Sequence, residues 1–190
     1  MYTVLGIDAD TLRIAYCRLN VQDGAFTLHS IGSVTRREMK RTPGVSRYTA
    51  TYTKELRDVL YPVMEADGDI YLEDAYMGRN RRTYGYLSQV QGELRYEVGA
   101  VFGAKKPMNI IQPSVWQSSI GKYFGLPFRA PLDTKECAMR CAAKILKYVP
   151  ASTHEADATC IAFYGYMEHI RVKDVSNAPE KKKGAVSRKR

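Results

Sequence analysis

Two short apolar runs, each closed by an acidic residue, constrain the fold of this 190-residue chain more than any other feature. The first run extends from Tyr2 to Ile7 and ends in Asp8, and the second covers residues 69–72 and ends in Glu73. Such runs are typical of buried strands. Because a segment with helical periodicity lies between them, the two strands should be parallel and joined by a right-handed crossover. Both acids would then emerge at the same edge of one sheet.

The remaining elements predict an α/β protein around these two strands. A turn at Asp23-Gly24 joins two further strands into an antiparallel meander with the first. The expected elements are strands at 13–21, 25–34 and 108–111, helices at 49–64, 83–102, 133–148 and 150–170, and a Gly/Pro-rich loop at 121–131. This order predicts one domain over residues 1–172 with a ribonuclease H-like fold, a mixed five-stranded sheet with helices on both faces.

Three glycines recur every seven residues in the expected helix over 83–102, at Gly85, Gly92 and Gly99. Small residues at this spacing predict close packing against another backbone. We expect this helix to lie behind the sheet in the core or at a subunit interface.

The charge of the chain indicates a polyanionic partner, with 29 basic and 20 acidic residues and a net charge of +9. Residues 173–190 hold seven basic and two acidic residues, so the remainder, with 22 against 18, carries +4. We expect residues 173–190 to form a disordered basic arm. Such an arm adds salt-dependent affinity for phosphates, but it does not position a substrate.

Several classes of protein are excluded by missing patterns. No apolar run is long enough to span a membrane, and the N-terminus lacks the basic region of a signal peptide. The four cysteines have no zinc-binding spacing, and free thiols favour a cytoplasmic setting, the bacterial host cytoplasm if the chain is phage-encoded. No Walker A, GxGxxG, HExxH or GxSxG motif is present, so we expect no nucleotide cofactor.

The segment 152–158 has the signature of a helix start that also carries chemistry. Ser152 followed by Glu155 forms a capping box, although Glu155 could instead be a metal ligand. His154 and Asp157 stand three residues apart and therefore share one face of the helix. Alternatively, His154 is only a polar residue of the first turn, and Asp157 is a favourable charge near the positive end of the helix dipole.

Together with Asp8 and Glu73, these two side chains make a plausible metal-ligand set. Carboxylates suit Mg²⁺ or Mn²⁺, and Mn²⁺ tolerates imidazole better. Two such ions can activate water and stabilise the leaving oxygen of a phosphodiester. Because a protonated imidazole cannot bind metal, activity should fall below about pH 6.5, the ordinary pKa of histidine.

At these residues the chain resembles the RuvC family of Holliday junction resolvases, especially the small bacteriophage members. The matching segments are residues 4–8, residues 72–80 with Gln89 and Gly92, and residues 154–158. The resemblance implies a homodimer on four-way or other branched DNA, paired nicks, and metal catalysis by Asp8, Glu73, His154 and Asp157. It also implies a catalytic lysine at Lys135 and an aromatic at Tyr76 that stacks on unpaired bases.

The chain departs from the family pattern at two places. Trp116 stands where bacterial members have a basic residue, a contact that Lys122 could supply. The loop after Glu73 is unusually basic, and we expect it to bind DNA through Arg79, Asn80, Arg81 and Arg82. Such charge favours recognition of backbone and shape, so weak sequence preference is expected.

Two other functions remain open, and a third is disfavoured by the sequence. One is a nuclease of the same fold that acts on RNA or RNA/DNA hybrids, and another is a catalytically silent junction-binding protein. A sugar-kinase-like ATPase also begins with a strand that ends in Asp, but Ala9-Asp10 does not supply the glycines that such a phosphate site needs.

Overall fold

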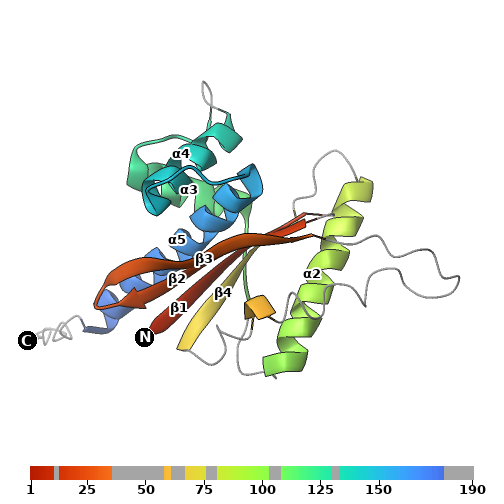
Figure 1. Cartoon of the computed structure of the whole chain (residues 1–190), viewed down its shortest axis with the longest axis horizontal. Helices are drawn as coiled ribbons and strands as arrows, with labels where there is room; N and C mark the ends of the chain where they lie inside the picture. The colour runs from red at the N-terminus through yellow and green to blue at the C-terminus, as the bar shows by residue number, and fades with distance from the viewer. Residues whose placement is uncertain are drawn as a thin grey trace, which may run out of the picture.

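The computed structural model describes residues 1–10, 13–35, 58–60, 67–75, 81–102, 108–129 and 133–177 (Figure 1). Five strands form one sheet in the order β3-β2-β1-β4-β5. The strands are β1 (Tyr2–Ala9), β2 (Arg13–Gln22), β3 (Ala25–Thr35), β4 (Asp67–Glu73) and β5 (Met108–Ile111).

The pairing of the strands confirms the expected mixed sheet. β1 is antiparallel to β2, β2 is antiparallel to β3, and β1, β4 and β5 run parallel to one another. The turn between β2 and β3 falls at Asp23 and Gly24, with φ angles of 52° and 79°. Two successive residues in the left-handed region are what a two-residue hairpin requires, because this turn matches the twist of the flanking strands.

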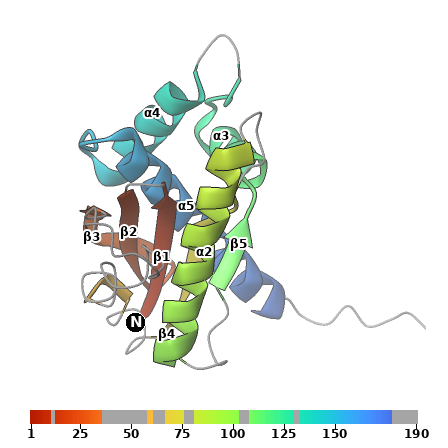
Figure 2. The same ribbon diagram turned by 90° about the vertical axis from the view of Figure 1, so that its right-hand side faces the viewer.

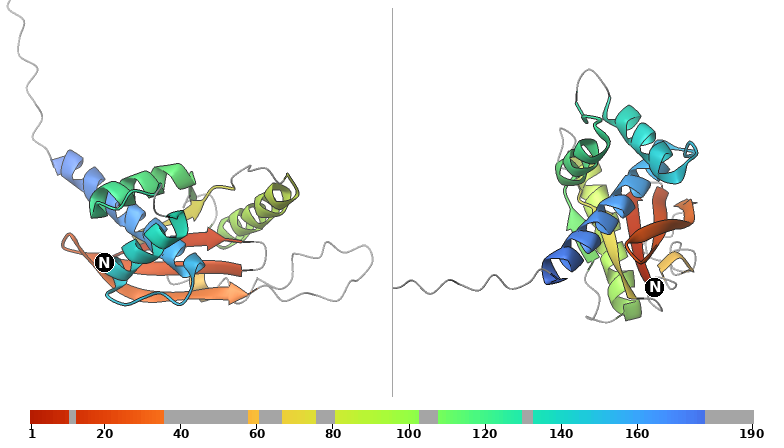
Figure 3. Two further views of the ribbon diagram at one scale, coloured as in Figure 1. Left: turned by 90° about the horizontal axis from the view of Figure 1, so that it is seen from above. Right: turned by 90° about the vertical axis from the view of Figure 1, so that its left-hand side faces the viewer.

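Helices cover both faces of the sheet, as expected. Helix α2 (Arg81–Phe102) packs on one face (Figure 2), and α3 (Pro113–Phe124), α4 (Thr134–Leu146) and α5 (Thr153–Asn177) gather on the other (Figure 3). Helix α5 crosses the central strands diagonally. Asp133 caps α4 as predicted, its carboxylate accepting a hydrogen bond from the Lys135 amide at 3.2 Å.

Two expectations about the helices need correction. The loop expected at 121–131 begins later, because α3 continues to Phe124 and stops at Gly125, which has a φ of 66°. Helix α5 runs to Asn177, past residue 170, where the final helix was expected to end. Of the helix expected over 49–64, only residues 58–60 are described, and they are helical; residues 178–190 also lie outside the described chain.

The alternation of side chains along β1 and β4 divides the core into two layers. Val4 and Tyr71 pack with the helices α3, α4 and α5, while Leu5, Ile70 and Leu72 pack with α2. Since successive side chains of a strand point to opposite faces, Asp8 shares its face with Val4, and Glu73 shares its face with Tyr71. Both acids are therefore directed to the side of the sheet that α5 covers.

A close approach of backbones fixes α5 on β1. A Cβ atom at Gly6 would lie 2.3 Å from the amide nitrogen of Ala162 and 2.4 Å from the carbonyl oxygen of Ala158. Only glycine permits this contact without a shift of the helix. Because Ala158 lies one turn after His154, the contact also sets where the helix start meets the end of β1.

The glycines of α2 do not make the close contacts that their spacing predicted within the described chain. Gly85, Gly92 and Gly99 are exposed, and a Cβ at any of them would have open space around it. The helix packs instead through Val90, Leu94 and Val98. At 100° per residue the two sets lie on opposite sides of the helix, so α2 belongs to the core and its glycine face points away from the sheet.

All four cysteines are buried and free. Among the described helices, none combines the length and hydrophobicity needed to cross a membrane.

Candidate active site

The start of α5 is capped by Ser152 as predicted, while the Glu155 side chain reaches one residue further back than in a standard capping box. The Ser152 hydroxyl accepts a hydrogen bond from the Glu155 amide at 3.2 Å. The Glu155 carboxylate reaches back to accept from the Ala151 amide at 3.0 Å. Glu155 is thus engaged in the cap, and His154 and Asp157 lie on the adjoining face of the helix.

His154 meets the end of β1 directly. Its Nδ1 atom lies 2.7 Å from Oδ2 of Asp8, and its Nε2 atom lies 3.7 Å from Oδ2 of Asp10. The imidazole therefore stands between two carboxylates. Asp10 was not among the residues that the sequence singled out, although its position two residues after Asp8 could have suggested it.

Glu73 is held at the end of β4 from both sides of the sheet. On the α3 side, the indole N–H of Trp116 donates to Oε2 of Glu73 at 3.1 Å. On the α2 side, the amide of Gln91 donates to the Glu73 backbone carbonyl at 2.7 Å. Trp116 is 1% exposed. At this position, where the family pattern has a basic residue, the chain has a buried donor that orients a carboxylate.

The site concentrates negative charge where water has little access. Burial, followed by repulsion from Asp8 and Asp157, raises the pKa of Glu73 to about 8. Burial and the charge of Asp8 raise the pKa of Asp157 to about 7, against the opposing effects of His154 and Lys135. The hydrogen bond to Asp8 raises the pKa of His154. Each of the four groups thus acts electrostatically on others of the set.

The donor set suits a hard divalent cation. Three carboxylates and one imidazole from two strand ends and one helix are ligands that Mg²⁺ or Mn²⁺ accepts, and a cation would relieve the repulsion that raises the two acid pKa values. Within the described part of the chain, no three His, Cys, Asp or Glu side chains already stand in a metal-holding arrangement. Asp8 and His154 instead satisfy each other.

The other predicted residues fall in different places. Lys135 is exposed in the first turn of α4 and close enough to Asp157 to lower its pKa. Lys122 is exposed near the end of α3. Tyr76, Arg79 and Asn80 lie outside the described residues, and Arg81 and Arg82 open α2 with side chains that are likewise not described.

A hollow opens beside Glu73 with a volume of about 640 Å³. Its lining includes Asp74 from the end of β4 and Ser114 and Gln117 from α3. The hollow lies between the end of β4 and the first two turns of α3.

Neither a protein-family model nor a curated protein matches the sequence. The structure does match solved structures. Over 88% of this chain and 96% of the other, it superposes on Thermus thermophilus RuvC in complex with a Holliday junction substrate, with a TM-score of 0.63 and 16% sequence identity. The chain has the RuvC fold.

Two further structures are similar. A second Thermus thermophilus RuvC structure has a TM-score of 0.58 at 16% identity, over 89% of this chain and 96% of the other. The Fowlpox virus resolvase in complex with its substrate Holliday junction DNA has a TM-score of 0.44 at 13% identity, over 90% and 98% of the two chains. The likeness to RuvC extends over nearly the whole of both chains, which confirms the fold expected from the sequence.

Proposed function

We propose that the protein is a divalent-metal-dependent endonuclease that resolves four-way DNA junctions by paired nicks. One observation carries the proposal. A RuvC fold places Asp8 and Glu73 at the carboxyl ends of two parallel central strands, and α5 brings His154 and Asp157 to the same corner of the sheet. Ligand and catalytic sites of open α/β sheets occupy this edge.

Asp8, Glu73, His154 and Asp157 would hold Mg²⁺ or Mn²⁺, two ions in the fullest arrangement. When bound, such ions lower the pKa of water and neutralise charge on the phosphodiester. Trp116 keeps the Glu73 carboxylate pointed into the site through its indole N–H. Lys135, exposed beside Asp157, supplies a positive charge to draw the scissile phosphate toward the acids.

The segment after β4 would engage the branch point. Tyr76 would stack on bases freed at the crossover, and the basic residues 79–82 would bind the phosphates around it. A homodimer would present two such sites to a junction, because paired nicks require one site for each cut strand.

The decisive experiment is cleavage of a synthetic four-way junction with Mg²⁺ or Mn²⁺, mapped on all four strands. Symmetric nicks in two opposed strands are expected from the wild type. Asp8→Asn should reduce cleavage by more than about 100-fold, the upper end for changes in the shell behind a metal ligand, while junction binding persists.

Asp23→Asn is the matched control. It removes the same charge at the exposed hairpin turn, where asparagine accepts the left-handed conformation. Wild-type binding without cleavage under either metal would favour a silent junction-binding protein.

A panel of four-way DNA, Y-junction, duplex and RNA/DNA hybrid separates the remaining alternative. Preference for the hybrid over branched DNA would favour an RNA-directed nuclease of the same fold. Because the expected contacts are to backbone and shape, cut sites should vary widely in sequence. A strict tetranucleotide preference would contradict this.

A further inference from the structure

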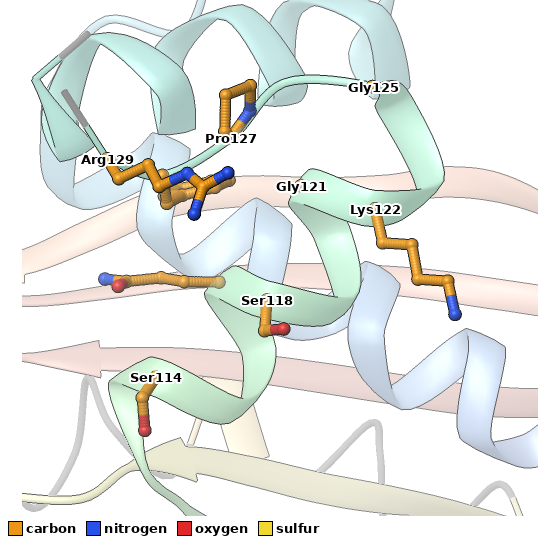
Figure 4. A pocket seen from close by; sticks show the side chains of 9 residues that line it. Ser114, Ser118, Gly121, Lys122, Gly125, Pro127 and Arg129 are labelled. Carbon is orange, nitrogen blue, oxygen red and sulfur yellow. The ribbon is translucent and has the colours of Figure 1, made fainter. Parts of the chain in front are cut away.

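A second hollow, of about 540 Å³, lies along α3 beyond the one beside Glu73 (Figure 4). Its polar lining consists of two hydroxyls, one amide and two cations, contributed by Ser114, Gln117, Ser118, Lys122 and Arg129. Among the described residues that line it, none is acidic. Such a surface carries a charge of +2 and several neutral donors.

The spacing along α3 places three of these side chains in one row. Ser114, Ser118 and Lys122 are four residues apart, so they share a helix face, and Figure 4 shows all three on the same side of α3. At 1.5 Å per residue the row is about 12 Å long. That length corresponds to three or four nucleotides of one strand of duplex DNA, which rises about 3.4 Å per nucleotide.

The position of Arg129 is fixed by the loop that follows α3. Gly121 carbonyl oxygen accepts from the Leu126 amide at 2.9 Å, and a Cβ at Gly121 would lie only 2.7 Å from the Leu126 carbonyl oxygen. The loop therefore folds tightly against the helix, and the Arg129 side chain extends back over α3 (Figure 4).

The same loop is anchored to the candidate active site. The Phe128 ring packs edge-on against Trp116, with ring centroids 5.5 Å apart, and Trp116 donates to Glu73. In addition, Ser114 and Gln117 line both hollows. The cationic surface is thus continuous with the site of the acids and is held in place by the same tryptophan.

We propose that this surface of α3 is a binding groove for the sugar–phosphate backbone of the cleaved DNA strand, beyond the scissile phosphate. This inference rests on the proposed nuclease function and adds to it a second contact region. Lys122 and Arg129 bind phosphates by charge, and the two serine hydroxyls and Gln117 donate to phosphate oxygens. Contacts of this kind carry no sequence information, so the groove would bind every sequence alike.

The test is the salt dependence of junction binding in an Asp8→Asn background, where cleavage is suppressed. The double variant Lys122→Gln with Arg129→Gln removes two phosphate contacts. The slope of log affinity against log salt concentration should fall by about 2, and affinity should fall about tenfold or more. Lys122→Arg alone should leave the slope near that of the Asp8→Asn parent, because the positive charge is kept.

The matched control is Arg171→Gln with Lys173→Gln. Both residues are exposed on α5, about 25–29 Å along the helix from His154, and the net charge lost is the same. An equal fall in slope for both double variants would overturn the groove, because bulk charge would then explain it. An unchanged slope in the α3 variant would also overturn it.

A positional measurement adds a second criterion. Neutral methylphosphonates placed one at a time along the cleaved strand should weaken binding by the Asp8→Asn protein at two or three phosphates on one side of the cut. The same substitutions should have no further effect in the α3 double variant. An identical pattern in both proteins would contradict the proposal.

These outcomes separate the two proposals. Normal cleavage with an unchanged slope and pattern would leave the nuclease standing without the groove. If the α3 double variant loses the slope and the methylphosphonate pattern while the wild-type protein does not cleave junctions, the groove is supported and the nuclease is overturned.

Discussion

The two faces of the sheet are packed by different means. On the α5 side, helix and strand meet backbone to backbone, because Gly6 leaves room for Ala158 and Ala162. On the α2 side, the contact is made by branched side chains such as Leu94 against the aliphatic residues of β1 and β4. All four candidate metal ligands lie on the α5 side or at its edge. The closer packing is found where side chains from distant segments must be held in register.

The sharpest way to break this contrast is Gly6→Ala. The added methyl would overlap backbone atoms of α5 at 2.3–2.8 Å, and a helix backbone cannot relax as a side chain can. We expect a loss of about 3 kcal/mol or more in unfolding free energy, with loss of activity in whatever remains folded. Urea unfolding and junction cleavage measure both. A stable, active variant would show that α5 is not fixed by this contact.

Leu94→Ala tests the other face. Removing a fully buried leucine side chain should cost about 2–4 kcal/mol. The site, however, lies across the sheet, so cleavage per folded molecule should stay near that of wild type. Activity would be normalised to the folded fraction from urea unfolding. A loss of activity larger than the loss of folded protein would mean that α2 also positions the acids, through Gln91 and Glu73.

The pH dependence of stability should originate on the α5 face. The pKa of Glu73 is raised to about 8 and that of Asp157 to about 7, so each acid holds its proton more tightly folded than unfolded. Their stabilisation is complete below about pH 4 and is lost as pH rises toward 8. The raised pKa of His154 acts in the same direction, above about pH 6.5.

The melting temperature of metal-free protein should therefore fall between pH 5 and pH 9. Each pKa unit corresponds to about 1.4 kcal/mol, or a few degrees for a chain of this size. Glu73→Gln should flatten the profile, Asp23→Asn should not, and Mg²⁺ or Mn²⁺ should restore stability at high pH. A wild-type melting temperature that does not change with pH would contradict the raised pKa values. The same Asp8–His154 contact moves the expected acid limb of cleavage above pH 6.5.

The smallest effect is expected from Gly92→Ala. The Cβ would enter open space on an exposed helix face, and alanine favours a helix over glycine by about 1 kcal/mol. We expect a gain of about 0.5–1 kcal/mol in unfolding free energy and no change in cleavage. A loss of stability or of cleavage would reveal a contact of this face with a second subunit. Analytical ultracentrifugation would detect that contact as a shift in oligomeric state.

The sequence could predict those features that follow from local pattern. Short apolar runs located β1 and β4, parallel pairing brought Asp8 and Glu73 to one edge, and the cap at Ser152 located the start of α5. These rules use only neighbours along the chain, so they needed no knowledge of the tertiary structure.

The features that were missed depend on tertiary contacts. Helix α3 was not predicted, because its serines, glycine and β-branched residues favour helix weakly, and burial of Trp116 and Ile120 stabilises it instead. The bond from Trp116 to Glu73 follows from that packing and has no local signal. The glycines of α2 were misjudged because a sequence does not distinguish a glycine under a backbone, like Gly6, from one facing open space.

The indole of Trp116 has a practical consequence for solution work. It is the only tryptophan in the chain, and it donates directly to a carboxylate of the candidate metal site. Its fluorescence therefore comes from a single position next to the chemistry. Protonation of Glu73 or the arrival of a cation changes the charge that the excited indole senses, so the unlabelled protein carries its own optical reporter of site occupancy.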